Sequence, residues 1–172
     1  MHSIREPVAA DAYPVARAHV RSWQVAYRGL FPDDYLDALA PEGRLEIWER
    51  RIADRSITPY FLVADVDGTA IGLCTASTSD DGAAQIEVRT LYVDPDHWGQ
   101  GAGRALHDAI LDRIRADGFT ELQLWVAPSN RRARTFYERC GWRDDAFEKT
   151  ETWIGGLTVT SRRYVRSLEP MR

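Results

Sequence analysis

Residues 91–105 read LYVDPDHWGQGAGRA, and this segment restricts the fold of the chain more than any other. The end of a strand runs through a turn into three alternating glycines, and a helical pattern follows. Glycine tolerates positive φ, so such a loop can turn successive backbone N–H groups toward one anion. The positive end of the following helix adds to the same spot. The segment therefore predicts a strand–loop–helix unit that binds a phosphorylated ligand.

The chain on either side of this loop predicts alternating strands and helices. A helix separates the strand that precedes the loop from the next strand, so we expect these two strands to be parallel with a right-handed crossover. The Asp-Val-Asp-Gly sequence at 65–68 and the Ile-Gly-Gly sequence at 154–156 instead predict antiparallel hairpins. Strands are expected at 3–5, 60–64, 70–75, 84–93, 122–126, 142–153 and 157–168, and helices at 11–27, 32–39, 41–52, 103–117 and 130–140.

These patterns predict an α/β (α+β) fold with a mixed, mostly antiparallel sheet, one central parallel strand pair and helices on both faces. With 172 residues, 44% of them hydrophobic, the chain suits one domain spanning 1–172. A net charge of -4 argues against a general nucleic-acid surface. No run of about 18 apolar residues and no basic, then apolar, leader is present, so we expect a cytoplasmic protein without a membrane partner.

The cysteines and histidines of the chain do not have the spacing of metal ligands. Cys74 and Cys140 form no Cys-x-x-Cys or Cys/His pattern, and we expect both to be reduced and structural. His19, His97 and His107 share no metal-ligand spacing either. No metal is expected.

Two nucleotide-binding motifs can be tested against the glycine loop. The P-loop pattern fails because no Gly-Lys-Ser/Thr follows. The dinucleotide fingerprint fails because Arg104 and Leu106 stand where its third glycine could fall. The glycines alone leave an ordinary surface turn about as plausible as a binding loop.

The loop resembles the acyl-CoA loop of the GNAT-type N-acetyltransferase superfamily, whose pattern is Gln/Arg-x-x-Gly-x-Gly/Ala. Gly101 and Gly103 match the two small positions, while Trp98 replaces the first residue. Residues 130–142, NRRARTFYERCGW, are similar to the superfamily's N-x-x-A-x-x-F-Y-E-x-x-G-F/W segment. The resemblance covers 60–164 as a fold and is sharpest over 87–142. It implies acetyl-CoA as acyl donor, an acceptor side in 1–58, the acyl-CoA site in 60–142 and a C-terminal hairpin in 143–168.

The resemblance also implies roles for individual residues. The Leu91 N–H would face the thioester carbonyl, the Val93 backbone would pair with pantetheine, and the Tyr137 phenol would protonate the departing thiolate. Tyr137 could instead be a core aromatic, and Asn130 could cap its helix as well as contact the cofactor. The residues expected to bind the cofactor are Leu91, Val93, Trp98, Gly99, Gln100, Gly101, Ala102, Gly103, Arg104, Asn130, Ala133 and Tyr137.

Glu87 is the candidate general base, because it matches the position of a catalytic glutamate in some members of the superfamily. Strand alternation predicts that Glu87, Arg89 and Leu91 share one face. The alternative is a solvated glutamate paired with Arg89. For the acceptor, Trp23, Tyr27 and Tyr35, with Asp33 and Asp34, could form an aromatic and acidic pocket suited to a cationic amine, and Glu87 is a further candidate for contact with the acceptor. Core packing is the alternative for Trp23 and Tyr27.

The resemblance thus implies an enzyme that passes an acetyl group from acetyl-CoA directly to a primary amine of a small molecule, peptide or protein. Two other functions stay open: an acyl-CoA sensor without turnover, and transfer of a longer acyl group. The long last hairpin could also offer an edge strand to a second copy, so a homodimer is possible.

Overall fold

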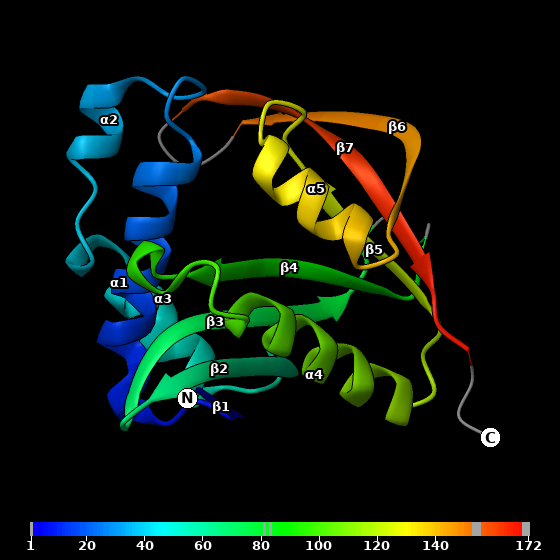
Figure 1. The fold of residues 1–172 in the computed structure, drawn as a ribbon, viewed down its shortest axis with the longest axis horizontal. Helices are drawn as coiled ribbons and strands as arrows, with labels where there is room; N and C mark the ends of the chain where they lie inside the picture. Colours follow the sequence, from blue (N-terminus) through cyan, green and yellow to red (C-terminus); the bar gives the residue numbers. More distant parts are fainter. Residues whose placement is uncertain (1, 81, 83, 153–155, 170–172) are drawn as a thin grey trace.

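The computed structural model describes residues 2–80, 82, 84–152 and 156–169. Its elements follow the predicted order, with ends shifted by a few residues (Figure 1). They are β1 (Ser3–Arg5), the 3-10 helix η1 (Ala9–Asp11), α1 (Ala12–Ala26), α2 (Asp33–Asp37), α3 (Glu42–Ala53), β2 (Tyr60–Val66), β3 (Thr69–Thr78), β4 (Ile86–Val93), the 3-10 helix η2 (Pro95–His97), α4 (Ala102–Ala116), β5 (Glu121–Val126), α5 (Arg131–Arg139), β6 (Arg143–Thr152) and β7 (Thr158–Ser167).

The strands form one seven-stranded sheet in the order β1-β2-β3-β4-β5-β7-β6. The β4–β5 pair is parallel and the other neighbouring pairs are antiparallel, which confirms the predicted mixed sheet. The β2–β3 turn is confirmed too: Asp67 and Gly68 have φ of 51° and 82°, as a tight type I′ hairpin turn requires. The β6–β7 strands pair as expected, although residues 154 and 155 of the predicted turn lie outside the described residues.

Helices cover both faces of the sheet, as expected. The apolar side of α4 packs on one face, through the fully buried Leu106, Ile110 and Ile114, and α5 lies against the same core. On the opposite face, α1 and α3 pack over β2 and β3, with Trp48 of α3 buried against Phe61. We call these the α4 face and the α1 face.

Strand β4 contains a bulge that changes which side chains reach each face. Thr75 of β3 pairs with Thr90, but its neighbour Ala76 pairs with Val88, so Arg89 is an extra residue in β4. An extra residue interrupts the alternation of side chains along a strand.

The prediction that Glu87, Arg89 and Leu91 share a face is therefore wrong. Val88 lies in the core of the α4 face, and beyond the bulge Leu91 packs against that same core. Glu87 is adjacent to Val88 and points the other way, as does Tyr92, which packs under α1. The bulge thus lets one strand present Leu91 to the α4 face and Tyr92 to the α1 face.

Candidate functional site

A gap between β4 and β5 lies at the centre of the molecule. The two strands pair only at Ile86–Leu122, Glu87–Gln123 and Val88–Leu124, before the bulge. Beyond that point they diverge, and α5 lies beside the opening (Figure 1). Beyond the paired part, no ladder partner from β5 faces the second half of β4 in the described residues, so backbone groups on that side of β4 can pair with a ligand.

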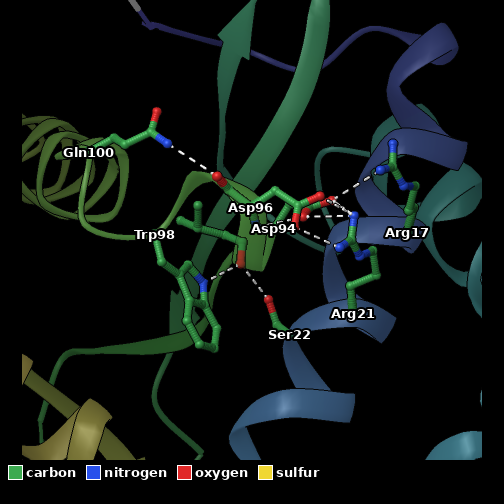
Figure 2. Close-up of polar contacts among 8 residues, drawn as sticks. Arg17, Arg21, Ser22, Asp94, Asp96, Trp98 and Gln100 are labelled. Atoms are coloured by element: carbon green, nitrogen blue, oxygen red, sulfur yellow. Dashed lines mark hydrogen bonds and ion pairs between the residues drawn. The ribbon is translucent and has the colours of Figure 1, made fainter.

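The hydrogen-bond pattern shows which groups of β4 face the gap. The Asp94 N–H donates to the Ile71 carbonyl of β3 at 2.8 Å. In an antiparallel pair, alternate residues point toward and away from the partner, so Leu91 and Val93 direct their backbone groups away from β3. The Val93 carbonyl confirms this direction, since it accepts hydrogen bonds from Trp98 Nε1 at 2.6 Å and Ser22 Oγ at 2.7 Å (Figure 2).

The glycine loop that follows β4 has the backbone conformation that the predicted anion site requires. Gly99 and Gly101 have φ of 76° and 90°, values that glycine adopts without steric cost. Gly103 lies within α4. The Ala105 N–H bonds the Gly101 carbonyl at 3.0 Å, so the N–H groups of residues 102–104 have no acceptor within the helix. These donors and the positive helix end together suit a pyrophosphate.

Side chains from α1 and from the loop itself hold this region in place (Figure 2). The buried Asp94 carboxylate pairs with Arg21 at 3.1 Å and with Arg17 at 3.5 Å, both on α1. Arg21 also pairs with Asp96 at 2.8 Å. The Gln100 amide donates to the Asp96 carbonyl at 3.1 Å. The predicted contact residue Gln100 thus turns its side chain onto the loop.

Trp98 joins the two sides of the gap. Its indole N–H holds the Val93 carbonyl of β4, while the guanidinium of Arg132, on α5, lies 3.9 Å from the centre of its ring. A cation over an indole face is attracted by the negative face of the ring. The guanidinium of Arg132 therefore places a positive charge beside residue 98. By contrast, the Arg104 side chain pairs with Asp108 at 2.6 Å on the exposed side of α4.

Helix α5 brings Asn130, Ala133 and Tyr137 to the α4 face. Asn130 Oδ1 accepts the Ala133 N–H at 3.1 Å, so the capping role is confirmed. Tyr137 is partly buried and packs against the same core as Leu91. Burial, and then the nearby Cys74 and Tyr92, raise the pKa of the Tyr137 phenol. A phenol with a raised pKa keeps its proton at neutral pH.

Glu87 is buried rather than solvated, with 7% of its surface exposed. Arg89 Nη1 donates to one carboxylate oxygen at 2.8 Å, and Gln123 Nε2 donates to the other at 3.0 Å. Arg89 also pairs with Asp80 at 2.8 Å. The pairing with Arg89 that the sequence left open is therefore present, but without the exposure that was expected with it.

Of the predicted acceptor residues, Trp23 and Tyr27 lie in a buried aromatic cluster on α1. Their ring centres are 4.9 Å apart, and Trp23 stacks on Phe31 at 5.8 Å. Tyr35 is partly exposed, with its ring centre 6.0 Å from that of Phe31. Core packing thus accounts for Trp23 and Tyr27. Tyr27 also interacts with α5, because the Asn130 side chain at the start of that helix bonds the Tyr27 hydroxyl.

Sequence reasoning did not find Ser22 or Tyr92 as parts of this site. Both act through contacts between elements far apart in the chain: Ser22 of α1 bonds the Val93 carbonyl, and Tyr92 of β4 stacks on His19.

Three further observations concern the cysteines, possible metal ligands and membrane spans. Cys74 and Cys140 are both buried and unpaired with each other. Among the described residues, no group of three or more His, Cys, Asp or Glu side chains could hold a metal ion. In the same part of the chain, every helix is too short or too polar to cross a bilayer.

Comparison with known proteins agrees with this architecture. Residues 19–142 match the model of the acetyltransferase (GNAT) family. Among curated proteins, an uncharacterized N-acetyltransferase, YuaI, of Bacillus subtilis is 28% identical over 76% of this chain and 74% of that protein. A mycothiol acetyltransferase of Beutenbergia cavernae is 41% identical over 45% of this chain, but over only 26% of its own length. An L-2,4-diaminobutyric acid acetyltransferase of Nocardia farcinica is 33% identical over 40% of this chain and 36% of that protein.

Solved structures share the fold over nearly the whole chain. The PaiA N-acetyltransferase of Thermoplasma acidophilum, solved with coenzyme A, has a TM-score of 0.77 at 20% identity, over 98% of this chain and 99% of that one. YncA of Salmonella typhimurium, solved with acetyl-CoA, has a TM-score of 0.70 at 18% identity, over 100% of this chain and 96% of that one. The family match includes strand β4, the glycine loop and α5, which surround the gap. The chain therefore belongs to the acetyltransferase (GNAT) family, whose members are acetyl-CoA-dependent acyltransferases.

Proposed function

We propose that this protein transfers an acetyl group from acetyl-CoA directly to a primary amine of a small molecule or peptide. The observation that carries the proposal is the gap between β4 and β5, toward which the Leu91 and Val93 backbone groups point, with the glycine loop at the end of β4 and Tyr137 on the same core as Leu91. Acetyl-CoA would supply the acetyl group as an activated thioester. The remaining chemistry belongs to residues of this chain.

The Leu91 N–H is the proposed donor to the carbonyl oxygen that becomes negative during transfer. It is fixed in a strand, so it needs no reorganisation when charge develops. The Val93 N–H is the proposed partner of the pantetheine arm, because its own carbonyl is held by Trp98 and Ser22. Both assignments follow from the direction of the β4 backbone beyond the bulge.

Tyr137 is the proposed acid for the departing thiolate. Its raised pKa favours a phenol that holds its proton until a strongly basic group appears beside it. Cys74 supports direct transfer over an acyl-carrier route. It is fully buried, and burial raises the pKa of its thiol, so the nucleophilic thiolate is disfavoured.

Glu87 is the proposed base on the acceptor side of β4. A lysine-like amine must lose about 3.4 pKa units' worth of proton affinity at pH 7, or about 4.6 kcal/mol, whereas an α-amine needs only about 1 kcal/mol. A base therefore matters most for a strongly basic acceptor. The names of the mycothiol and diaminobutyric acid acetyltransferases favour a small-molecule acceptor over a protein.

Two measurements test the proposal. Acetyl-CoA at a hundredfold excess over its dissociation constant should stabilise the protein by about 2.7 kcal/mol in a thermal melt. A panel of small amines, polyamines and peptides should then release free CoA thiol with at least one acceptor. Absence of stabilisation rejects the cofactor assignment, and stabilisation without thiol release from any acceptor favours a sensor.

A further inference from the structure

Two arginines of α3 lie on the inner side of that helix, on either side of a buried tryptophan. Arg44, Trp48 and Arg51 are spaced so that they share one helix face. Arg44 is only 9% exposed and Trp48 only 1% exposed, while the guanidinium carbon of Arg51 lies 5.1 Å from the centre of the Trp48 ring. We call Arg44 and Arg51 the guanidinium pair.

The guanidinium pair lies beside the strand that forms the gap. The Trp48 indole donates to His19 Nδ1 at 3.3 Å, and the His19 ring stacks on Tyr92 with ring centres 4.7 Å apart. Tyr92 stands in β4 between Leu91 and Val93, and it faces the α1 side. The pair therefore approaches the reaction site from the side opposite to α4 and α5.

Within the described residues, neither arginine of the pair forms an ion pair or a hydrogen bond with a carboxylate. Other partly buried arginines of the same region do: Arg21 pairs with Asp94 and Asp96, and Arg89 pairs with Glu87 and Asp80. A guanidinium group withdrawn from water without a counter-ion is costly, and arginines that are nearly buried usually have one.

The interactions of His19 place both guanidinium groups near its imidazole. Burial, and then Arg44 and Arg51, lower the pKa of His19 to about 3. Burial, and then Arg50, lower the pKa of Arg51; Tyr92 raises it and Arg89 lowers it. Arg51 therefore has two other arginines and the Tyr92 hydroxyl as charged or titratable neighbours.

A planar guanidinium group matches the geometry of a carboxylate or phosphate, and two of them make a specific oxyanion site. We propose that the guanidinium pair binds the oxyanion of an acceptor that carries a carboxylate or phosphate group as well as its reactive amine. This inference rests on the proposed acetyl transfer and narrows its substrate to small anionic amines, such as amino acids.

The charges along the α1 face of β4 suit such a molecule. Glu87 and Tyr92 lie on this face at opposite ends of the bulge, with the guanidinium pair near Tyr92. A zwitterionic acceptor can thus place its anion at the arginines and its amine toward the gap and Glu87. Opposite charges at the two ends of a site orient the ligand as well as bind it.

The experiment compares acceptors in matched pairs, each with and without the anionic group: 2,4-diaminobutyrate with 1,3-diaminopropane, lysine with cadaverine, and phosphoethanolamine with ethanolamine. The enzyme variants are Arg44→Gln and Arg51→Gln. Arg50→Gln is the control, since it removes the same charge from an exposed position on the same helix. Circular dichroism and thermal melts verify that each variant folds.

Charge-assisted hydrogen bonds of this kind contribute enough to change affinity by about 10- to 100-fold. We expect each guanidinium variant to raise KM for the anionic acceptors by that factor, with kcat and the KM for acetyl-CoA within about twofold of the wild type. The uncharged acceptors and the Arg50→Gln variant should show no such change. The carboxylate and phosphate arms identify which oxyanion is preferred.

Equal use of charged and uncharged acceptors by the wild type would overturn the inference while leaving acetyl transfer intact. So would an equal loss on both kinds of acceptor in Arg44→Gln and Arg51→Gln. If no amine supports turnover, binding of the anionic amines is measured by thermal shift with and without CoA. Stabilisation that Arg51→Gln abolishes supports the site even then, and no stabilisation rejects it. Failure of CoA itself to bind is a separate result that rejects the proposed function.

Discussion

The two faces of β4 are built in different ways. On the α4 face, the proposed donor site consists of backbone groups: strand N–H groups at Leu91 and Val93, and the glycine loop that begins α4. On the α1 face, the proposed acceptor site consists of side chains: Arg44 and Arg51 of α3, connected to Tyr92 through Trp48 and His19, and Glu87 of β4. A site made of backbone groups keeps the same ligand when side chains are substituted, whereas a site made of side chains can change its ligand by substitution without a change in the fold. The comparison teaches that the donor is fixed by the chain's geometry and the acceptor by its individual residues.

The largest expected effect separates the chemistry from both binding sites. Tyr137→Phe should lower kcat about 100-fold, since it removes the proposed acid, and leave the KM for acetyl-CoA within about twofold. Because the pKa of Tyr137 is raised, the phenol stays protonated as pH rises, and wild-type turnover should not fall between pH 7 and 9. Steady-state kinetics across pH measure both.

Tyr60→Phe is the matched control for Tyr137→Phe. Tyr60 belongs to the same core, but its hydroxyl donates to Asp117 at 2.7 Å, away from β4. We expect it to change stability and not kcat. A parallel loss of acetyl-CoA binding in Tyr137→Phe would make Tyr137 structural, and the donor site would then rest on backbone groups alone.

The next effect tests whether the donor site depends on backbone position. A Cβ at Gly72 would lie 2.8 Å from the Tyr92 carbonyl oxygen and 3.0 Å from Val93 Cγ2, so Gly72→Ala must displace β4. We expect a loss of about 2 kcal/mol in the free energy of unfolding and weaker acetyl-CoA binding. Denaturant unfolding and calorimetric titration measure the two.

Gly43→Ala is the control for Gly72→Ala, because a Cβ there meets nothing within 4 Å on α3. It should stabilise the helix by about 0.5–1 kcal/mol and leave acetyl-CoA binding unchanged. Normal cofactor affinity in a destabilised Gly72→Ala protein would contradict a donor site set by the β4 backbone.

The smallest effect concerns the contact across the gap. Arg132→Gln removes a positive charge that lies over Trp98, beside the proposed pyrophosphate site, so affinity for the anionic CoA should fall about fivefold, or about 1 kcal/mol. Arg131→Gln removes the same charge from the neighbouring exposed position and should have less effect. A change in acceptor KM instead of CoA affinity would assign Arg132 to the other site.

The same contrast explains what the sequence could predict. The glycine loop and the α5 segment are each continuous in the chain, so the spacing of residues within each segment is enough to predict the strand, the loop and the helices. The β4 bulge left no signal, because Arg89 suits an alternating strand as well as a bulge, and the prediction for Glu87 and Leu91 failed there. The guanidinium pair was also unmarked. Arg44 and Arg51 lie near β4 only because α3 packs near Tyr92, and this tertiary packing cannot be read from the spacing of residues along the chain.

The bulge also restricts how β4 can change in length. Its two halves are in opposite phase, so a change of one residue between Ile86 and Val93 must be absorbed by losing or enlarging the bulge at Arg89, or it would exchange inward and outward positions on one side of Arg89. Two residues would restore the phase but move the glycine loop by about 7 Å along the strand axis. The backbone of β4 and its loop therefore holds the proposed oxyanion donor at Leu91 and the proposed phosphate site at Gly101 at a constant separation. A constant separation suits a cofactor of constant length, and it does not restrict the side chains of the opposite face.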